Sequence, residues 1–353
     1  MEILIFSVKI SNIYFCKIIK YKNQNNKQIY RKWYRIRLSS KKRGNIMHTV
    51  VFGAGAVGGY FGGKLASAGY PVTFLVREKR FEQLNKRNLR VLSFHGDFTI
   101  TPNLAVSSNE IEHPELVILA LKNYHLEGAL PQLETLIKKG AKILPLLNGV
   151  QHMEVLTNQF GEENILGGVC YIESTLTEEG DIVQTSPMHD IVFGALHNKQ
   201  SPFLNQMEDM FKQSNVNVIQ TENIVSEMWN KFIFLATLSG ITSATRQPIG
   251  VAMNDTATKA LLEDLVQEIY QTAISLNIPL ADDTVEKIVK KAEGLPPAMT
   301  SSMHRDLEKG LPLEVESLQG YILDQATQHR IQVPVVRAIY SLLHPYTNGG
   351  PLK

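Results

Sequence analysis

A glycine-rich segment near residue 53 has the spacing of a phosphate-binding turn. Six residues follow an apolar run and open a helical pattern: Gly53, Ala54, Gly55, Ala56, Val57 and Gly58. The first glycine permits a tight turn, the second lets the backbone approach a pyrophosphate, and the third allows the helix to pack closely on the strand. The anion would lie at the positive N-terminus of that helix. The segment predicts a dinucleotide-binding loop, with a glycine turn that binds nothing as the alternative.

Arg77 stands at the end of the next apolar run, where an NAD site usually places an acidic residue. A cation at this point can pair with a 2′-phosphate. The sequence therefore favours NADPH/NADP over NAD as the cofactor. Glu78 is adjacent, and a solvated loop charge is the alternative role for Arg77.

Two loops at predicted strand ends carry further candidate residues. Lys122 in LKNYH can meet a phosphate or ribose, and Asn148 in LLNGV can hold the nicotinamide, a substrate or both. Open α/β sheets bind ligands at the carboxyl ends of their strands, which favours a functional role for both residues. Ordinary turn chemistry is the alternative, since Asn-Gly is a common turn pair.

Lys231 precedes a nearly uninterrupted apolar run within residues 226–250. Apolar surroundings disfavour an ammonium ion unless an anion compensates, and they can tune a lysine for acid–base work. A lysine that extends from a helix edge into solvent is the alternative. Ser302 and Glu314 follow in SSMHRDLEKGLPLEVESLQG, and Glu314 begins a predicted helix whose dipole favours a carboxylate. A capping role is the alternative for Glu314.

These residues need two kinds of scaffold. Strands alternate with helices up to about residue 221, which predicts parallel crossovers and a sheet covered on both faces. The period then becomes helical to the end of the chain. The expected strands are 49–55, 72–76, 115–121, 141–147, 164–176, 181–185, 190–194 and 216–221; the expected helices are 57–68, 78–87, 124–139, 201–214, 223–244, 254–277, 282–292, 314–329 and 334–345. The fold class is α/β, with a Rossmann-type dinucleotide-binding domain at 47–222 and an all-α domain at 223–345.

Charge divides the chain at Met47. Residues 1–46 carry 12 Lys and Arg against one acid, and the remainder carries 24 against 33. An acidic body without a basic stripe argues against nucleic-acid binding, which needs clustered cations. The two cysteines are too few for a disulfide framework, and the ten histidines show no paired-ligand spacing. We therefore expect small-molecule chemistry in the cytoplasm, without a metal.

The basic leader at 1–46 has its apolar run before its positive charges, the reverse of a secretory signal. Its apolar stretches are too short to cross a membrane. A basic tail for membranes or nucleic acid is one reading. The favoured reading is upstream sequence translated from an early start codon, because Met47 directly precedes the first strand of the body. The leader is given no fold.

From Met47 to about residue 345 the chain resembles the ketopantoate reductase family. The resemblance rests on GAGAVGGYFGGKLASAG, the strand-end arginine, LKNY, LNGV, the WNK helix, and SSM followed twelve residues after its second serine by Glu314. It implies that the helical domain is of the 6-phosphogluconate dehydrogenase C-terminal type and that the active site lies between the domains. It further implies that Lys231 is the general acid and Glu314 a cleft carboxylate near the nicotinamide ribose and substrate. Asn148 would bind cofactor and substrate, Ser302 substrate, and Lys122 cofactor.

Three positions depart from the family pattern. The family usually carries Asn four, eight and eighteen residues after the lysine, where this chain has Leu235, Ser239 and Ile249. The resemblance implies reduction of 2-dehydropantoate to pantoate with NADPH, as a step of pantothenate biosynthesis. The altered side chains at these three expected substrate contacts leave open a related reductase of another branched 2-oxoacid. A non-catalytic NADP-binding sensor is the other alternative function. A homodimer is left open as the assembly.

Overall fold

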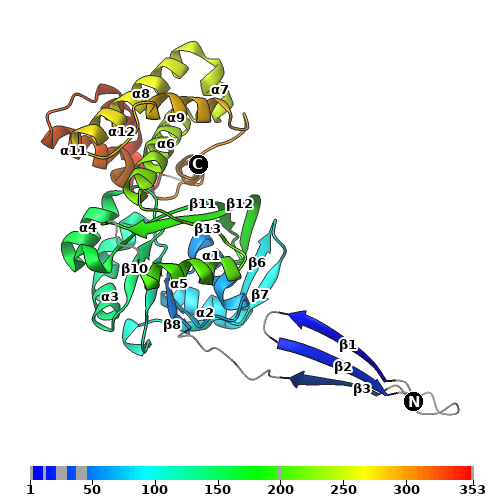
Figure 1. The fold of residues 1–353 in the computed structure, drawn as a ribbon. Coiled ribbons are helices and arrows are strands. Elements are labelled where there is room, and N and C mark those ends of the chain that lie inside the picture. Colours follow the sequence, from blue (N-terminus) through cyan, green and yellow to red (C-terminus); the bar gives the residue numbers. More distant parts are fainter. Residues whose placement is uncertain (1–2, 11–12, 21–29, 37–45, 198–200, 351–353) are drawn as a thin grey trace.

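The computed structural model describes residues 3–10, 13–20, 30–36, 46–197 and 201–350. Within the leader, three strands form an antiparallel sheet: β1 (Ile3–Ile10), β2 (Ile13–Lys20) and β3 (Tyr30–Ile36). In the described part of the chain these strands pair only with one another, and Figure 1 shows their sheet to one side of the remaining fold. That the leader lies outside the functional fold stays a prediction.

A sheet of five parallel strands follows, in the order β10–β9–β4–β5–β8. The strands are β4 (Thr49–Phe52), β5 (Val72–Leu75), β8 (Asn103–Ala105), β9 (Leu116–Leu119) and β10 (Lys142–Pro145). Successive side chains of a strand point to opposite faces. Val50 accordingly packs in the core that includes α3 (Leu126–Lys138), and Val51 in the core that includes α1 (Ala56–Ser67). The predicted α/β class is confirmed.

A second sheet has the order β11–β12–β6–β7, with β13 paired to β12. Its strands are β6 (Leu89–Ser93), β7 (Phe98–Ile100), β11 (Leu166–Leu176), β12 (Ile182–Ala195) and β13 (Asn217–Gln220). Helix α1 lies between the two sheets. Its glycines have no side chains, so both sheets can pack closely against the helix. An added Cβ would lie 2.4 Å from Ile182 Cδ1 at Gly59 and 2.5 Å from Val51 Cγ2 at Gly62.

Helices α2, α4 and α5 complete this half of the chain. They span Glu78–Arg87, Gln151–Phe160 and Pro202–Gln213. The second half is helical, as predicted, and Figure 1 shows it stacked on the sheets. Its helices are α6 (Ile224–Thr245), α7 (Ile249–Asn254), α8 (Thr256–Ser275), α9 (Thr284–Glu293), α10 (Ser302–Glu308), α11 (Tyr321–Gln328) and α12 (Pro334–Leu343). The predicted boundary near residue 222 falls between β13 and α6.

Helix α6 is the element that joins the two halves. An added Cβ on Gly167 of β11 would lie 2.6 Å from Ile224 Cγ1, so the first turn of α6 packs directly on the second sheet. Most of its 22 residues are buried, in a core continuous with that of α3. Because its first turn packs on the second sheet, α6 places its later residues at a fixed distance from the sheets.

The single helix expected at 314–329 is divided into a π-helix and an α-helix. A π-helix (Glu316–Gly320) leads into α11 without a break. The buried Gln319 of the π-helix donates from Nε2 to the Ala236 carbonyl at 2.9 Å, which ties the segment to α6. π-helical turns are rare and occur mostly at functional sites.

Other differences concern short elements. The β segments expected at 181–185 and 190–194 are one strand, β12, which pairs with β11 on both sides of an irregularity at residues 185–188. Strands β6, β7 and β8 and helices α4, α7 and α10 were not predicted from the sequence. In the part of the chain that the structure describes, no helix is both long and apolar enough to span a membrane.

Candidate active site

The glycine loop connects β4 to α1. Gly53 has φ +101°, and an added Cβ there would lie 2.6 Å from the Ala120 carbonyl oxygen. A Cβ on Gly58 would lie 2.1 Å from the Gly53 carbonyl oxygen, whereas a Cβ on Gly55 would meet nothing within 4 Å. Gly53 and Gly58 therefore close the turn, and Gly55 faces open space where a ligand's backbone can approach.

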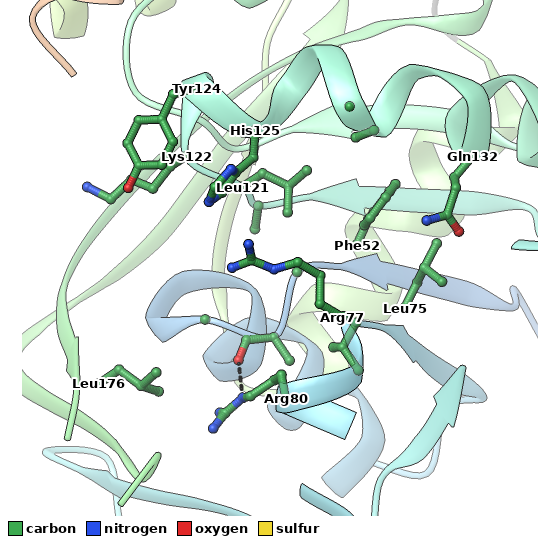
Figure 2. Close-up of a pocket in the computed structure, with 17 residues that line it drawn as sticks. Phe52, Leu75, Arg77, Arg80, Leu121, Lys122, Tyr124, His125, Gln132 and Leu176 are labelled. Carbon is green, nitrogen blue, oxygen red and sulfur yellow. Dashed lines mark hydrogen bonds between the residues drawn. The ribbon is translucent and has the colours of Figure 1, made fainter. Parts of the chain in front are cut away.

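A cavity of about 550 Å³ opens beside this loop. Gly53, Ala54 and Gly55 line it on one side, and residues that follow β5 and β9 line the others. Figure 2 shows the Arg77 side chain extending into the cavity from the end of β5. Among the described residues Arg77 has no carboxylate partner, so its charge is available to an anionic ligand.

Arg80, which the sequence did not single out, supports the loop instead. Its Nε donates to the Ala54 carbonyl at 3.0 Å and its Nη1 to the Gly180 carbonyl at 3.0 Å. Burial lowers the pKa of Arg80, and the nearby Asp181 carboxylate opposes that shift. Both arginines line the cavity, but only Arg80 also holds the loop in place.

A second cavity, of about 410 Å³, shares Gly55, Ala120, Leu121 and Lys122 with the first. Further predicted residues line it: Ala56, Val57, Asn148, Lys231, Ser302 and Glu314. The two cavities therefore meet at the carboxyl ends of β4 and β9. Together they form one elongated site that runs from Arg77 to the helical half of the chain.

Lys122 forms salt bridges with two carboxylates from the helical half of the chain. Its Nζ lies 3.0 Å from Asp306 Oδ2 and 3.0 Å from Glu314 Oε2. Burial alone would lower the pKa of Lys122, but the charges and hydrogen bonds of Glu314 and Asp306 outweigh it and raise the pKa well above its usual range. The loop after β9 is thereby joined to α10 and to the segment before the π-helix.

Glu314 does not cap a helix. It is buried, and its Oε1 accepts from the backbone N of Asn123 at 3.3 Å and from Asn123 Nδ2 at 3.1 Å. The same Nδ2 donates to the Asn148 carbonyl at 2.7 Å, which fixes the Asn148 loop. Gly149 has φ +82°, and an added Cβ would lie 3.0 Å from the Ser317 carbonyl oxygen of the π-helix. The Asn148 side chain is thus presented to the cavity by a turn that requires glycine.

Lys231 projects from α6 toward β11 and lines the second cavity rather than extending along the helix edge. Its Nζ donates to the Cys170 carbonyl at 2.7 Å and lies 5.6 Å from the centre of the Tyr171 ring. In the described part of the chain it has no carboxylate partner. Burial, with a smaller contribution from the Lys231 charge, lowers the pKa of the nearby His152 to about 3.

The two serines at the start of α10 both line the cavity but differ in their bonds. Ser301 is buried, caps the helix by accepting from the His304 N at 3.0 Å, and accepts from Thr242 Oγ1 at 3.1 Å. Ser302 lines the cavity, as does Arg305 one turn later. Arg305 and Asp306 were missed, because nothing in the sequence shows that α10 packs beside the loop after β9.

Only one of the three positions that depart from the family pattern faces the site. Leu235 lines the second cavity, whereas Ser239 and Ile249 are buried elsewhere. An α-helix turns about 100° per residue, so Leu235 lies about 40° from Lys231 around α6 and Ser239 about 80°. Of the three substrate contacts expected to be altered, only the one at Leu235 lies in the site. Leu238 also lines the cavity and extends the apolar wall that Leu235 begins.

Known proteins resemble the chain over both of its halves. Residues 49–198 match the family described as ketopantoate reductase PanE/ApbA, and residues 223–347 match its C-terminal counterpart. An uncharacterized oxidoreductase of Bacillus subtilis, YkpB, is 34% identical over 300 residues, which cover 85% of this chain and 99% of that protein. A 2-dehydropantoate 2-reductase of Nostoc is 26% identical over 83% of this chain and 93% of its own length. The solved 2-dehydropantoate 2-reductase of Geobacter metallireducens superposes with a TM-score of 0.78 at 26% identity, over 85% of this chain and 99% of that one.

Proposed function

The chain belongs to the ketopantoate reductase family and is an oxidoreductase, and on that premise we propose that it reduces 2-dehydropantoate to pantoate with NADPH. The observation that carries the proposal is the position of Lys231. Its amine and Ser302 line a cavity that is continuous with the cavity of the glycine loop. This arrangement supports a reaction in which a proton donor and a bound dinucleotide act on one substrate.

The cofactor site fits a phosphorylated dinucleotide. Gly55 leaves open space at the loop, and Arg77, which has no carboxylate partner among the described residues, extends into the same cavity. The loop from Gly53 to Gly58 would hold the pyrophosphate and Arg77 the 2′-phosphate. When bound, the cofactor supplies the hydride that reduces the ketone carbon.

Lys231 supplies the proton. The Cys170 carbonyl accepts one of the three N–H donors of its ammonium group and fixes the direction of the side chain. The remaining donors are free to bind a ketone oxygen and to protonate it as it becomes an alkoxide. Asn148 and Ser302 would orient the substrate, and Glu314, held by Lys122 and Asn123, would orient substrate and cofactor.

One observation favours a second substrate class. Leu235, Leu238 and Met299 give the cavity an apolar wall, and Leu235 replaces an asparagine of the family pattern. Such a wall offers no hydrogen-bond partner to a substrate hydroxyl, so it gives no preference for a hydroxylated substrate. A branched 2-oxoacid without hydroxyl groups is therefore the alternative substrate. For either substrate we propose a cytoplasmic reaction, because the two cysteines of the chain give no disulfide framework.

The direct test is oxidation of NADPH in the presence of 2-dehydropantoate and of hydroxyl-free 2-oxoacids, with complementation of a pantothenate auxotroph. Replacement of Lys231 by Ala should lower kcat by about 10² to 10⁴, the range for loss of a positioned proton donor, with NADPH affinity nearly unchanged. Lys287→Ala, on a surface helix and paired with Asp283, is the matched control. A Lys231→Ala protein with the kcat of the wild type would refute the proposed mechanism.

A further inference from the structure

Three cations line the second cavity: Lys122, Lys231 and Arg305. Lys122 is already paired with Asp306 and Glu314. Lys231 is needed at the ketone oxygen of the substrate. Among the described residues that line the cavity, Arg305 is therefore the cation that neither a carboxylate nor the proton transfer engages.

Arg305 is exposed at the mouth of the cavity, and one hydrogen bond orients its side chain. Its Nη1 donates to the Thr300 carbonyl at 3.0 Å, which leaves most of the five N–H donors of the guanidinium group for other acceptors. The neighbouring carboxylate of Asp306 bonds Lys122 and so does not neutralise Arg305. Ser302 precedes Arg305 by three residues on α10, a spacing that places both side chains on one face of a helix.

A 2-oxoacid presents a carboxylate next to its ketone. A carboxylate that leaves water without a paired charge is costly, and an arginine can pair with both of its oxygens at once. We propose that Arg305, with the Ser302 hydroxyl beside it, binds the substrate carboxylate and so directs the ketone oxygen to Lys231. This inference rests on the proposed function and adds the residue that selects acids over their neutral analogues.

The test compares wild type, Arg305→Gln, Arg305→Lys and the control Arg337→Gln, which lies on the exposed side of α12. Three quantities are measured: KM and kcat for a 2-oxoacid and its methyl ester, and the affinity for oxamate, an unreactive 2-oxoacid analogue, in the presence of NADPH. Arg305 is exposed, so loss of its hydrogen bonds to the carboxylate should raise KM for the acid roughly 10- to 100-fold in Arg305→Gln. KM for the ester, kcat and the NADPH affinity should change far less.

Arg305→Lys keeps the charge without the planar fork, so its KM for the acid should lie between those of wild type and Arg305→Gln. Oxamate should bind wild type and the Arg337→Gln protein and be lost in Arg305→Gln. The inference is overturned if Arg305→Gln binds oxamate as wild type does, or if wild type does not bind it. A wild-type protein that binds oxamate but turns over no 2-oxoacid contradicts the proposed function and leaves the carboxylate site supported.

Discussion

His152 should make the folded protein sensitive to mild acid. The side chain lies on α4 with 2% of its surface exposed, and both ring nitrogens are buried without a hydrogen-bond partner among the described residues. Burial, with a smaller effect from Lys231, lowers its pKa from 6.5 to about 3. We predict that replacing His152 by Leu, which removes the titratable group and leaves no polar atom unpaired, will flatten the dependence of stability on pH.

The sign and size follow from proton linkage. Between pH 6.5 and 3 the unfolded chain binds a proton at His152 and the folded chain does not, so acid favours unfolding. Each pH unit in that window is worth about 1.4 kcal/mol. From pH 7 to pH 5 this one residue should lower the free energy of unfolding by about 2 kcal/mol, allowing for partial protonation at pH 7.

The assay is urea unfolding of wild type, His152→Leu and His329→Gln at pH 7 and pH 5. His329 is exposed and serves as the control. Other titrating groups are shared, so they cancel when the loss of stability in each variant is compared with that of wild type. The loss should be about 2 kcal/mol smaller in His152→Leu than in wild type, and unchanged in His329→Gln. An equal loss in wild type and His152→Leu would show that His152 is protonated or solvated in the folded state, contrary to the structure.

Two predictions concern the cofactor. Arg77→Asp places an anion where the 2′-phosphate would bind, so the Kd for NADPH should rise about 30-fold or more while that for NADH changes little. An equal loss of affinity for both cofactors would contradict the proposal that Arg77 binds the 2′-phosphate. Gly58→Ala puts a methyl group 2.1 Å from the Gly53 carbonyl oxygen, so the loop must shift and NADPH affinity should fall at least about tenfold. Gly294→Ala is the control, because its added Cβ comes no closer than 3.6 Å to the atoms around it. Unchanged NADPH binding in Gly58→Ala would mean that the loop tolerates the displacement.

The sequence predicted the elements that repeat a strong pattern. β4, β5 and β9 are short apolar runs, each followed by a helical segment, and that alternation is sufficient to predict a parallel sheet. β7 and β8 are three residues each and partly exposed, so they lack a hydrophobic period that could reveal them. Their pairing is decided by the strands beside them, which only the tertiary structure supplies.

The site shows the same limit. Lys122, Lys231 and Glu314 were found from strand ends, apolar context and the resemblance, and the structure brings all three to one cavity. Their individual roles stay predictions. Sequence reasoning gave Lys122 to the cofactor and did not anticipate that Asp306 and Glu314 would bind it, because ion pairs between distant segments leave no local trace.

The π-helix restricts how the length of this chain can change. Gln319 anchors the segment to α6, while Glu314, five residues earlier, reaches across to Lys122 and Asn123. Deletion of one residue between these two anchors would let the segment relax to an ordinary helix, but it would rotate Glu314 by about 100° and shift it by about 1.5 Å. The carboxylate would then point away from both partners. Helices elsewhere can lose a residue at a surface end, but this stretch has to keep its number of residues for as long as Glu314 has to reach the site.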